Sequence, residues 1–320
     1  MHDRVPSLSV PARARVDGVE ECFAVINGLR WRYQHAGSGP PLLLIHGFMA
    51  YSFSWRMVIK ALAEHYTVYA MDLPGTGFSQ RNALLPGTLA SDAEHLLQFM
   101  NHLGLKECDI IGTSRGGGAT IALCALLAQK GQLHRIHRII LSAPINPWSR
   151  YENARVHFLE TPLGCFYVVH MASRLSIILK RYFLQLYYNR ATIPADSFAG
   201  YQTGLAAAGS FQHLWKIARS WFADLNHIEN CIPLAQSLPA LILWGEHDRA
   251  VRPASAYEIH RRWKNSVVVM MPNIGHMPYE EAPEEFTRIA LDFLLRNIPP
   301  ISHDESQLAL ATAHQGPATA

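Results

Sequence analysis

The segment Gly112-Thr113-Ser114-Arg115-Gly116 decides the fold that we predict for this chain. The apolar stretch before it, Cys108 to Ile111, is typical of a buried strand, and the Ala/Leu-rich stretch after it, Gly117 to Leu127, is long enough only for a helix. A serine at such a turn points its Oγ away from the backbone, at the positive end of the helix. Small neighbours let the strand fold back on the helix without collision. The pattern predicts that Ser114 is a nucleophile.

Four further segments place polar motifs directly after apolar, strand-like stretches. Their motifs are His46-Gly47-Phe48 after Pro41 to Ile45, Asp72-Leu73-Pro74-Gly75-Thr76-Gly77-Phe78-Ser79 at the end of Thr67 to Met71, Gly245-Glu246-His247-Asp248 after Leu241 to Trp244, and Asn273-Ile274-Gly275-His276 after Val267 to Met271. The Gly75-x-Gly77 spacing lacks the third glycine and the following helix of a dinucleotide fingerprint, so we interpret it as a shaping turn.

These motifs together resemble those of the α/β-hydrolase superfamily, in its serine-nucleophile, esterase- and lipase-like branch. The resemblance covers about residues 20–145 and 230–298. It implies the catalytic triad Ser114, Asp248 and His276, in the chain order expected for that family. Glu246 is the chemical competitor of Asp248, but the family pattern G-x-x-D favours Asp248, and the loop from 143 to 148 has no carboxylate.

The resemblance also implies an oxyanion hole formed by the backbone amides of Phe48 and Arg115. It assigns a structural role to His46. Substrate contacts are predicted at four apolar or aromatic positions: Met49, Trp55, Phe166 and Tyr167. Whether the Arg115 side chain contacts the substrate is left open by the sequence.

The implied fold is α/β: a mostly parallel eight-stranded sheet flanked by helices, with an inserted helical cap. Strands are predicted near 22–26, 30–34, 42–45, 67–71, 109–112, 138–141, 240–244 and 267–271, with helices alternating from the third strand onward. Asn27-Gly28 predicts a hairpin between the first two strands. The stretch from Pro283 to Asn297 has the periodicity of an amphipathic helix.

The predicted organisation has four parts. They are an N-terminal extension (1–19), a core in two pieces (20–146 and 238–298), a helical cap (147–237) and a disordered tail (299–320). Thr161 to Ala195 carries Arg and Lys but no acid and is otherwise dense in apolar residues. A cap packed on the core accounts for this composition, and an apolar substrate tunnel with transient contact to lipid surfaces is the alternative.

Composition excludes several classes of protein. The net charge of +3 over 320 residues is too small to indicate nucleic-acid binding. Five cysteines without a C-x-x-C pair indicate neither a disulfide framework nor a zinc site, and they favour a reducing compartment. Met1 to Val16 has no apolar signal-peptide core, and no apolar run is long enough to span a membrane, so we expect a cytoplasmic protein. The oligomeric state is left open.

The chemistry implied is a two-step acyl transfer that requires no metal or organic cofactor. Ser114 attacks the carbonyl of a small, apolar ester, His276 accepts its proton, and water releases the acid. Two alternatives use the same residues. One is hydrolysis of a carbon–carbon bond in a diketone-like compound, although relatives of that kind usually have Asn where this chain has Thr113. The other is a ligand-binding receptor with a slow triad.

Overall fold

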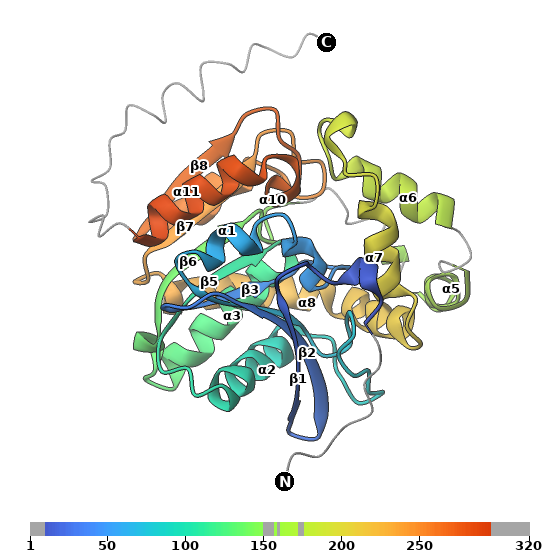
Figure 1. Cartoon of the computed structure of the whole chain (residues 1–320), viewed down its shortest axis with the longest axis horizontal. Coiled ribbons are helices and arrows are strands. Elements are labelled where there is room, and N and C mark those ends of the chain that lie inside the picture. The colour runs from blue at the N-terminus through green and yellow to red at the C-terminus, as the bar shows by residue number, and fades with distance from the viewer. Residues whose placement is uncertain (1–9, 150–156, 159–160, 172–175, 296–320) are drawn as a thin grey trace.

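The computed structural model describes residues 10–149, 157–158, 161–171 and 176–295. One eight-stranded sheet has the order β1-β2-β4-β3-β5-β6-β7-β8 (Figure 1). The strands are β1 (Glu20–Ile26), β2 (Leu29–Ala36), β3 (Pro41–Ile45), β4 (Thr67–Asp72), β5 (Cys108–Thr113), β6 (Ile136–Ser142), β7 (Ala240–Gly245) and β8 (Ser266–Met271). Only β2 pairs antiparallel to its neighbours, β1 and β4, and the remaining pairs are parallel. The predicted fold class is confirmed.

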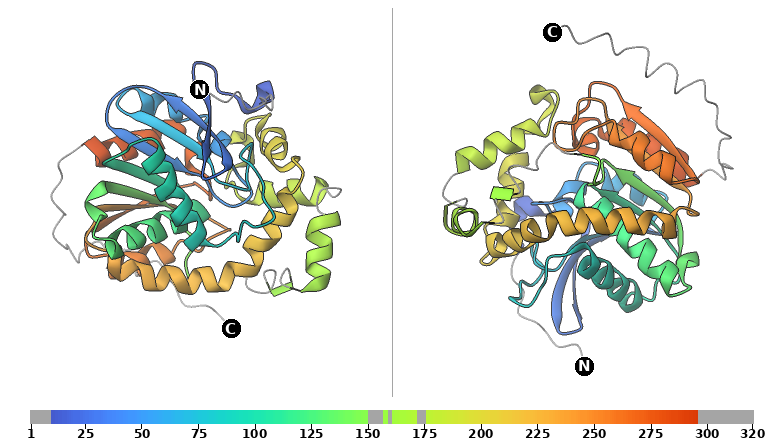
Figure 2. Two further views of the ribbon diagram at one scale, coloured as in Figure 1. Left: turned by 90° about the horizontal axis from the view of Figure 1, so that it is seen from below. Right: turned by 180° about the vertical axis from the view of Figure 1, so that it is seen from behind.

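Helices cover both faces of the sheet. Helices α2 (Leu89–His102), α3 (Arg115–Gln129) and α8 (Ser210–Ala235) pack on one face, and α1 (Ile59–Ala63) and α11 (Pro283–Leu295) pack on the other (Figures 1 and 2). Strand β3 shows why its sequence is apolar throughout. Leu43 and Ile45 face the first layer of helices while Leu42 and Leu44 face the second, because successive side chains of a strand point to opposite faces.

The N-terminal part of the chain forms the antiparallel edge of the sheet. Asn27 and Gly28 have φ values of 49° and 76°, so both adopt the left-handed conformation that a tight hairpin turn requires. Val10, Ala14 and Val19 are buried in the layer that contains α1 and α11. The part of the predicted extension that the structure describes therefore packs on the core, whereas residues 1–9 and the predicted tail 299–320 lie outside the described residues.

The described residues between β6 and β7 are mainly helical. It contains α5 (Pro162–Phe166), a π-helical turn (Tyr167–Met171), α6 (Ser176–Gln185), a short 3₁₀ turn (Arg190–Thr192), α7 (Ser197–Leu205) and α8. We call α5, α6 and α7 the insertion helices; they lie to one side of the sheet (Figure 1). Within the described residues, no helix combines the length and the hydropathy that a membrane span requires.

The two halves of helix α8 pack against different parts of the protein. Its N-terminal end lies beside the insertion helices, and its C-terminal half runs along the same face of the sheet as α3 (Figure 2). Leu225, Ile228 and Ile232 in that half are buried in the core cluster of α2 and α3. The second half of α8, which the sequence assigned to the cap (147–237), thus packs on the same face of the sheet as α2 and α3.

Candidate active site

Ser114 lies at the turn between β5 and α3 and has φ 52° and ψ −120°. A non-glycine residue rarely adopts this conformation, and strain of this kind is held in place by the surrounding structure. The glycines of the motif allow the close approach. A Cβ added to Gly116 would lie 2.3 Å from the carbonyl oxygen of Ile45, and one added to Gly112 would lie 2.3 Å from Thr120 Oγ1. The sequence motif thus forms the sharp turn that was predicted for it.

Asp248 and His276 lie in loops after β7 and β8 and meet through a hydrogen bond. The distance between His276 Nδ1 and Asp248 Oδ2 is 2.7 Å. The other carboxylate oxygen, Oδ1, accepts the amides of Ala250 and Val251 at 2.7 and 2.9 Å. These amides orient the carboxylate: Oδ1 is hydrogen-bonded to the backbone of the loop, and Oδ2 is hydrogen-bonded to the imidazole. Glu246, the chemical competitor, is exposed.

Ser114 and His276 line one cleft of about 620 Å³, a volume that includes the part open to solvent. The cleft is bounded on the core side by Gly47, Phe48, Met49, Ala50, Met277 and Tyr279, and on the other side by residues of α6, α7 and the segment between them. Its walls are mainly apolar, and among the described residues that line it there is no Arg or Lys.

The two amides predicted to form the oxyanion hole flank this cleft. A Cβ added to Gly47 would lie 3.1 Å from Ser114 Cβ, so the Gly47-Phe48 segment passes directly beside the serine. Arg115 is the first residue of α3, and the amides of the first helical turn have no acceptor within the helix. The donor role of these two amides stays a prediction.

His46 supports the loop rather than the cleft. Its Nδ1 donates to the carbonyl of Gly47 at 2.9 Å, and its Nε2 accepts the amide of Leu73 at 3.2 Å. Complete burial lowers the pKa of His46, which keeps the ring neutral and able to accept at Nε2. These contacts agree with the structural role that the sequence assigns to it.

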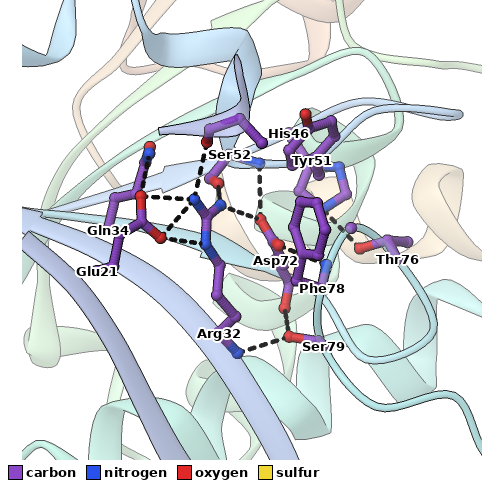
Figure 3. A network of polar contacts seen from close by, with 12 residues as sticks. Glu21, Arg32, Gln34, His46, Tyr51, Ser52, Asp72, Thr76, Phe78 and Ser79 are labelled. Carbon is purple, nitrogen blue, oxygen red and sulfur yellow. Dashed lines mark hydrogen bonds and ion pairs between the residues drawn. The ribbon is translucent and has the colours of Figure 1, made fainter. Parts of the chain in front are cut away.

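The turn after β4 is organised around the buried carboxylate of Asp72 (Figure 3). Asp72 Oδ2 accepts the amide of Phe78 at 2.8 Å, and Oδ1 accepts the amide of Ser52 at 2.9 Å. Gly77 has φ 50°, and a Cβ there would lie 2.2 Å from Asp72 Oδ2. Arg32, which is fully buried, contacts Asp72 at 3.1 Å and Glu21 at 2.7 Å. This network shapes the turn after β4, which His46 contacts through Leu73 and Thr76. None of these bonds involves Ser114.

The Arg115 side chain points away from the cleft. It forms an ion pair with Asp92 in α2, donates to the carbonyl of Gly87 at 2.8 Å, and lies 3.7 Å from Asp224 in α8. The side chain is buried and is not part of the cleft wall. This arrangement ties the N-terminus of the helix after Ser114 to two neighbouring helices.

Buried His213 in α8 makes stability depend on pH. Burial lowers the pKa of His213 to about 4, below the ordinary value of about 6.5 that applies to the unfolded chain. Unfolding between pH 6.5 and 4 therefore takes up a proton, so stability falls as the pH falls through this range, by up to about 3 kcal/mol. We expect His213→Gln to reduce this dependence in urea unfolding at pH 7 and pH 4.5. Exposed His102→Gln is the control, and an unchanged slope in His213→Gln would contradict the assignment.

Of the four residues predicted to contact the substrate, one lines the cleft and three do not. Met49 lines the cleft. Trp55 does not: it is fully buried and packs on Tyr279 and Phe286, with ring centroids 5.0 and 6.5 Å away. Phe166 is 57% exposed, and Tyr167 is half-buried; neither lines the cleft. The structure therefore does not bring Trp55, Phe166 or Tyr167 to the cleft that Ser114 lines.

The wall of the cleft comes instead from the next two insertion helices, which the sequence analysis did not single out. The contributing residues are Leu179, Tyr182, Phe183 and Leu186 in and after α6, and Phe198, Tyr201, Gln202 and Leu205 in α7. Both sets follow the pattern i, i+3, i+4, i+7, which places the side chains on one face of a helix. That periodicity is the signal that could have identified them. Among the described residues, no group of three His, Cys, Asp or Glu side chains could hold a metal ion.

The fold agrees with the comparisons with known proteins. The chain belongs to the alpha/beta hydrolase fold family, whose sequence model matches residues 40–283. It is 27% identical over 282 residues to the uncharacterized hydrolase YugF of Bacillus subtilis, with 88% of this chain and 97% of that protein covered. The crystal structure of a lipase described as putative, from Acinetobacter baumannii, has a TM-score of 0.73 at 24% identity, covering 88% of this chain and 92% of that one.

Two relatives with named reactions are similarly distant. The pimeloyl-[acyl-carrier protein] methyl ester esterase of Nitrosospira multiformis is 25% identical over 272 residues, covering 78% of this chain and 92% of the esterase. The 2-hydroxy-6-oxo-6-(2'-aminophenyl)hexa-2,4-dienoic acid hydrolase of Metapseudomonas resinovorans is 27% identical over 290 residues, covering 86% and 91%. The chain is thus a hydrolase of this family, and its relatives include esterases and carbon–carbon bond hydrolases.

Proposed function

We propose that this protein hydrolyses carboxylic esters of apolar acids through an acyl-enzyme on Ser114. The observation that carries the proposal is that a strained serine and a histidine bonded to a buried carboxylate line the same cleft. In this mechanism His276 Nε2 accepts the Ser114 proton as Oγ attacks the ester carbonyl. The amides of Phe48 and Arg115 stabilise the oxyanion, and the alcohol leaves with a proton from His276. A water molecule then releases the acid by the same steps.

The Asp248 contact supports the assignment of roles within this mechanism. Because Nδ1 of His276 lies 2.7 Å from Asp248 Oδ2, a proton on Nδ1 is held there. Nε2 is then the nitrogen that accepts the serine proton in this mechanism. The imidazolium that forms is stabilised by the carboxylate, which two backbone amides hold in position.

An apolar ester fits the walls of the cleft better than a charged substrate. No Arg or Lys is present among the described residues that line it, so nothing of that kind would pair with a substrate carboxylate. Apart from Gly47, Ser114, Gln202 and His276, the residues that line it are aliphatic or aromatic. The test is turnover of chromogenic esters, together with mapping of the adduct that a fluorophosphonate forms. We expect a single adduct at Ser114, and modification of another residue would refute the mechanism.

Carbon–carbon bond hydrolysis is the second candidate, favoured by the likeness to the hydrolase of Metapseudomonas resinovorans. The substrate named for that relative carries a carboxylate, for which the cleft of this chain offers no described Arg or Lys. Loss of the ultraviolet absorbance of a vinylogous diketone, without ester turnover, would establish this candidate in place of the first. If the protein turns over neither the esters nor the diketone but still binds one of these compounds, the result would indicate a ligand-binding receptor.

The preferred acyl length provides a second test of the apolar cleft. Each methylene buried is worth about 0.8 kcal/mol, so kcat/KM should rise roughly fourfold per added carbon until the cleft is full. We expect butyrate to octanoate esters to be better substrates than acetate. Leu179→Gln, in the cleft wall, should flatten this profile. Phe166→Gln, on exposed α5, is the matched control and should not change it. Acetate as the best substrate of the wild type would contradict an apolar acyl site.

A further inference from the structure

The carboxylate of Glu280 is buried beside the cleft and has an unusually complete set of donors. It is 2% exposed and lies in α10 (Pro278–Glu281), four residues after His276. Its donors are Arg56 Nη1 and Nη2 at 2.6 and 2.9 Å, Tyr187 Oη at 2.6 Å, Tyr201 Oη at 2.5 Å and Ser197 Oγ at 3.3 Å. A buried carboxylate is unfavourable unless it is paired and hydrogen-bonded, and this one is both. We call these five residues the Glu280 clasp.

The clasp joins elements from different parts of the chain. Arg56 follows the short 3₁₀ helix Ser52–Trp55 of the core, and its guanidinium also lies 4.1 Å from the ring centroid of Phe53. Tyr187 follows α6, while Ser197 and Tyr201 lie in α7. Helices α6 and α7 form the wall of the cleft opposite Ser114. One carboxylate of the core therefore holds both helices that bound the substrate site.

A second set of bonds joins the same part of the insertion to the loop of the predicted catalytic histidine. The amide of His276 donates to the carbonyl of Leu186 at 2.7 Å. Glu281 accepts the amides of Tyr188 and Gly275 at 2.8 Å each. The segment after α6 is thus bonded to residues before and after Glu280 in the sequence. These bonds do not involve the Glu280 carboxylate, so the His276 loop keeps them when one donor of the clasp is removed.

We propose that Glu280 is a positioning residue that holds α6 and α7 over the cleft and so determines which acyl chains the enzyme accepts. The proposal rests on the ester hydrolysis proposed above and adds to it a determinant of substrate choice outside the predicted triad. Tyr201 donates to Glu280 and also lines the cleft, so the position of the carboxylate determines where this part of the cleft wall lies. Burial and the neighbouring carboxylate both raise the pKa of Tyr187 and of Tyr201, which keeps the two phenols protonated as donors.

A variant of Tyr187 distinguishes an effect of helix positioning from an effect of direct contact with the substrate. It is buried, donates to Glu280 and does not line the cleft. Tyr187→Phe removes one donor and leaves the Arg56–Glu280 ion pair in place, so the variant is expected to fold. Any change in substrate preference then arises through the clasp. Glu280→Gln removes the negative charge that all the donors of the clasp share. It should change the substrate preference in the same direction as Tyr187→Phe, and by more.

The experiment compares wild type, Tyr187→Phe, Glu280→Gln and the exposed control Glu284→Gln. The readouts are kcat and KM for acetate and octanoate esters, the rate of Ser114 labelling by a small fluorophosphonate, and amide hydrogen exchange over residues 176–205. We expect Tyr187→Phe to lower kcat/KM for octanoate about tenfold, mainly through KM, which is the effect of losing one charge-assisted hydrogen bond. Acetate turnover and labelling should change less than twofold, and exchange in 176–205 should rise.

Wild-type ester ratios combined with wild-type exchange in Tyr187→Phe would overturn the proposal, even if Glu280→Gln fails to fold. Equal losses for acetate and octanoate would also overturn it, because they indicate a general loss of active protein. Failure of the proposed function gives a different result: wild type would then turn over no ester. In that case the exchange comparison between Tyr187→Phe and Glu284→Gln alone decides whether the clasp holds α6 and α7.

Discussion

Ser114→Ala is expected to lower kcat for ester hydrolysis by about four to six orders of magnitude and to abolish fluorophosphonate labelling. The variant loses the only atom that forms the covalent bond in the proposed mechanism, while the cleft and the backbone amides stay in place. The residual rate would come from binding and the oxyanion hole. Burst and steady-state kinetics with a chromogenic ester measure the loss.

His276→Ala provides the internal control for this experiment. A nucleophile and its base act as one unit, so the double variant should be no slower than either single variant. Additive losses would show that His276 does not act on Ser114. Full activity in Ser114→Ala would refute the covalent mechanism, and the search for the nucleophile would move to other residues of the cleft.

Asp248→Asn is expected to lower kcat by about 10³–10⁴-fold without a large change in KM. The amide can donate a hydrogen bond to Nδ1 of His276, which leaves the proton on Nε2 and removes the base that Ser114 requires. The buried position of Asp248 and its short contact with the imidazole make this effect large. The change is nearly isosteric, so the loop should keep its shape.

Glu246→Gln is the matched control for that variant. Glu246 lies two residues earlier in the same loop, and its side chain is exposed, so its loss should change kcat by less than about twofold. Circular dichroism and thermal unfolding of both variants separate a chemical effect from unfolding. If Glu246→Gln were the slower variant, the acid of the triad would be Glu246 and the loop would rearrange in solution.

The sequence alone determined the features that depend on local sterics and periodicity. The strand β3 was predictable because Leu42 to Ile45 is apolar on both faces, which only a strand covered on both sides requires. The turn at Ser114 was predictable because its glycines leave room for the carbonyls and side chains that approach them. The pairing of Asp248 with His276 was implied by the resemblance to the α/β-hydrolase superfamily. The two residues can meet because each follows a strand of a parallel sheet, whose carboxyl ends lie along one edge.

Only the tertiary structure decided how the insertion helices sit on the core. An apolar stretch is recognisable in sequence, but its composition does not state which surface it covers. Phe166 in α5 is exposed, whereas Tyr201 in α7 lines the cleft. Trp55 was misplaced for a similar reason, since a large aromatic fits a core as well as a cleft. The direction of the Arg115 side chain was set by Asp92 and Asp224, which come from two other helices. The Glu280 clasp likewise joins residues up to 224 positions apart, and such contacts exist only once the packing of the helices is complete.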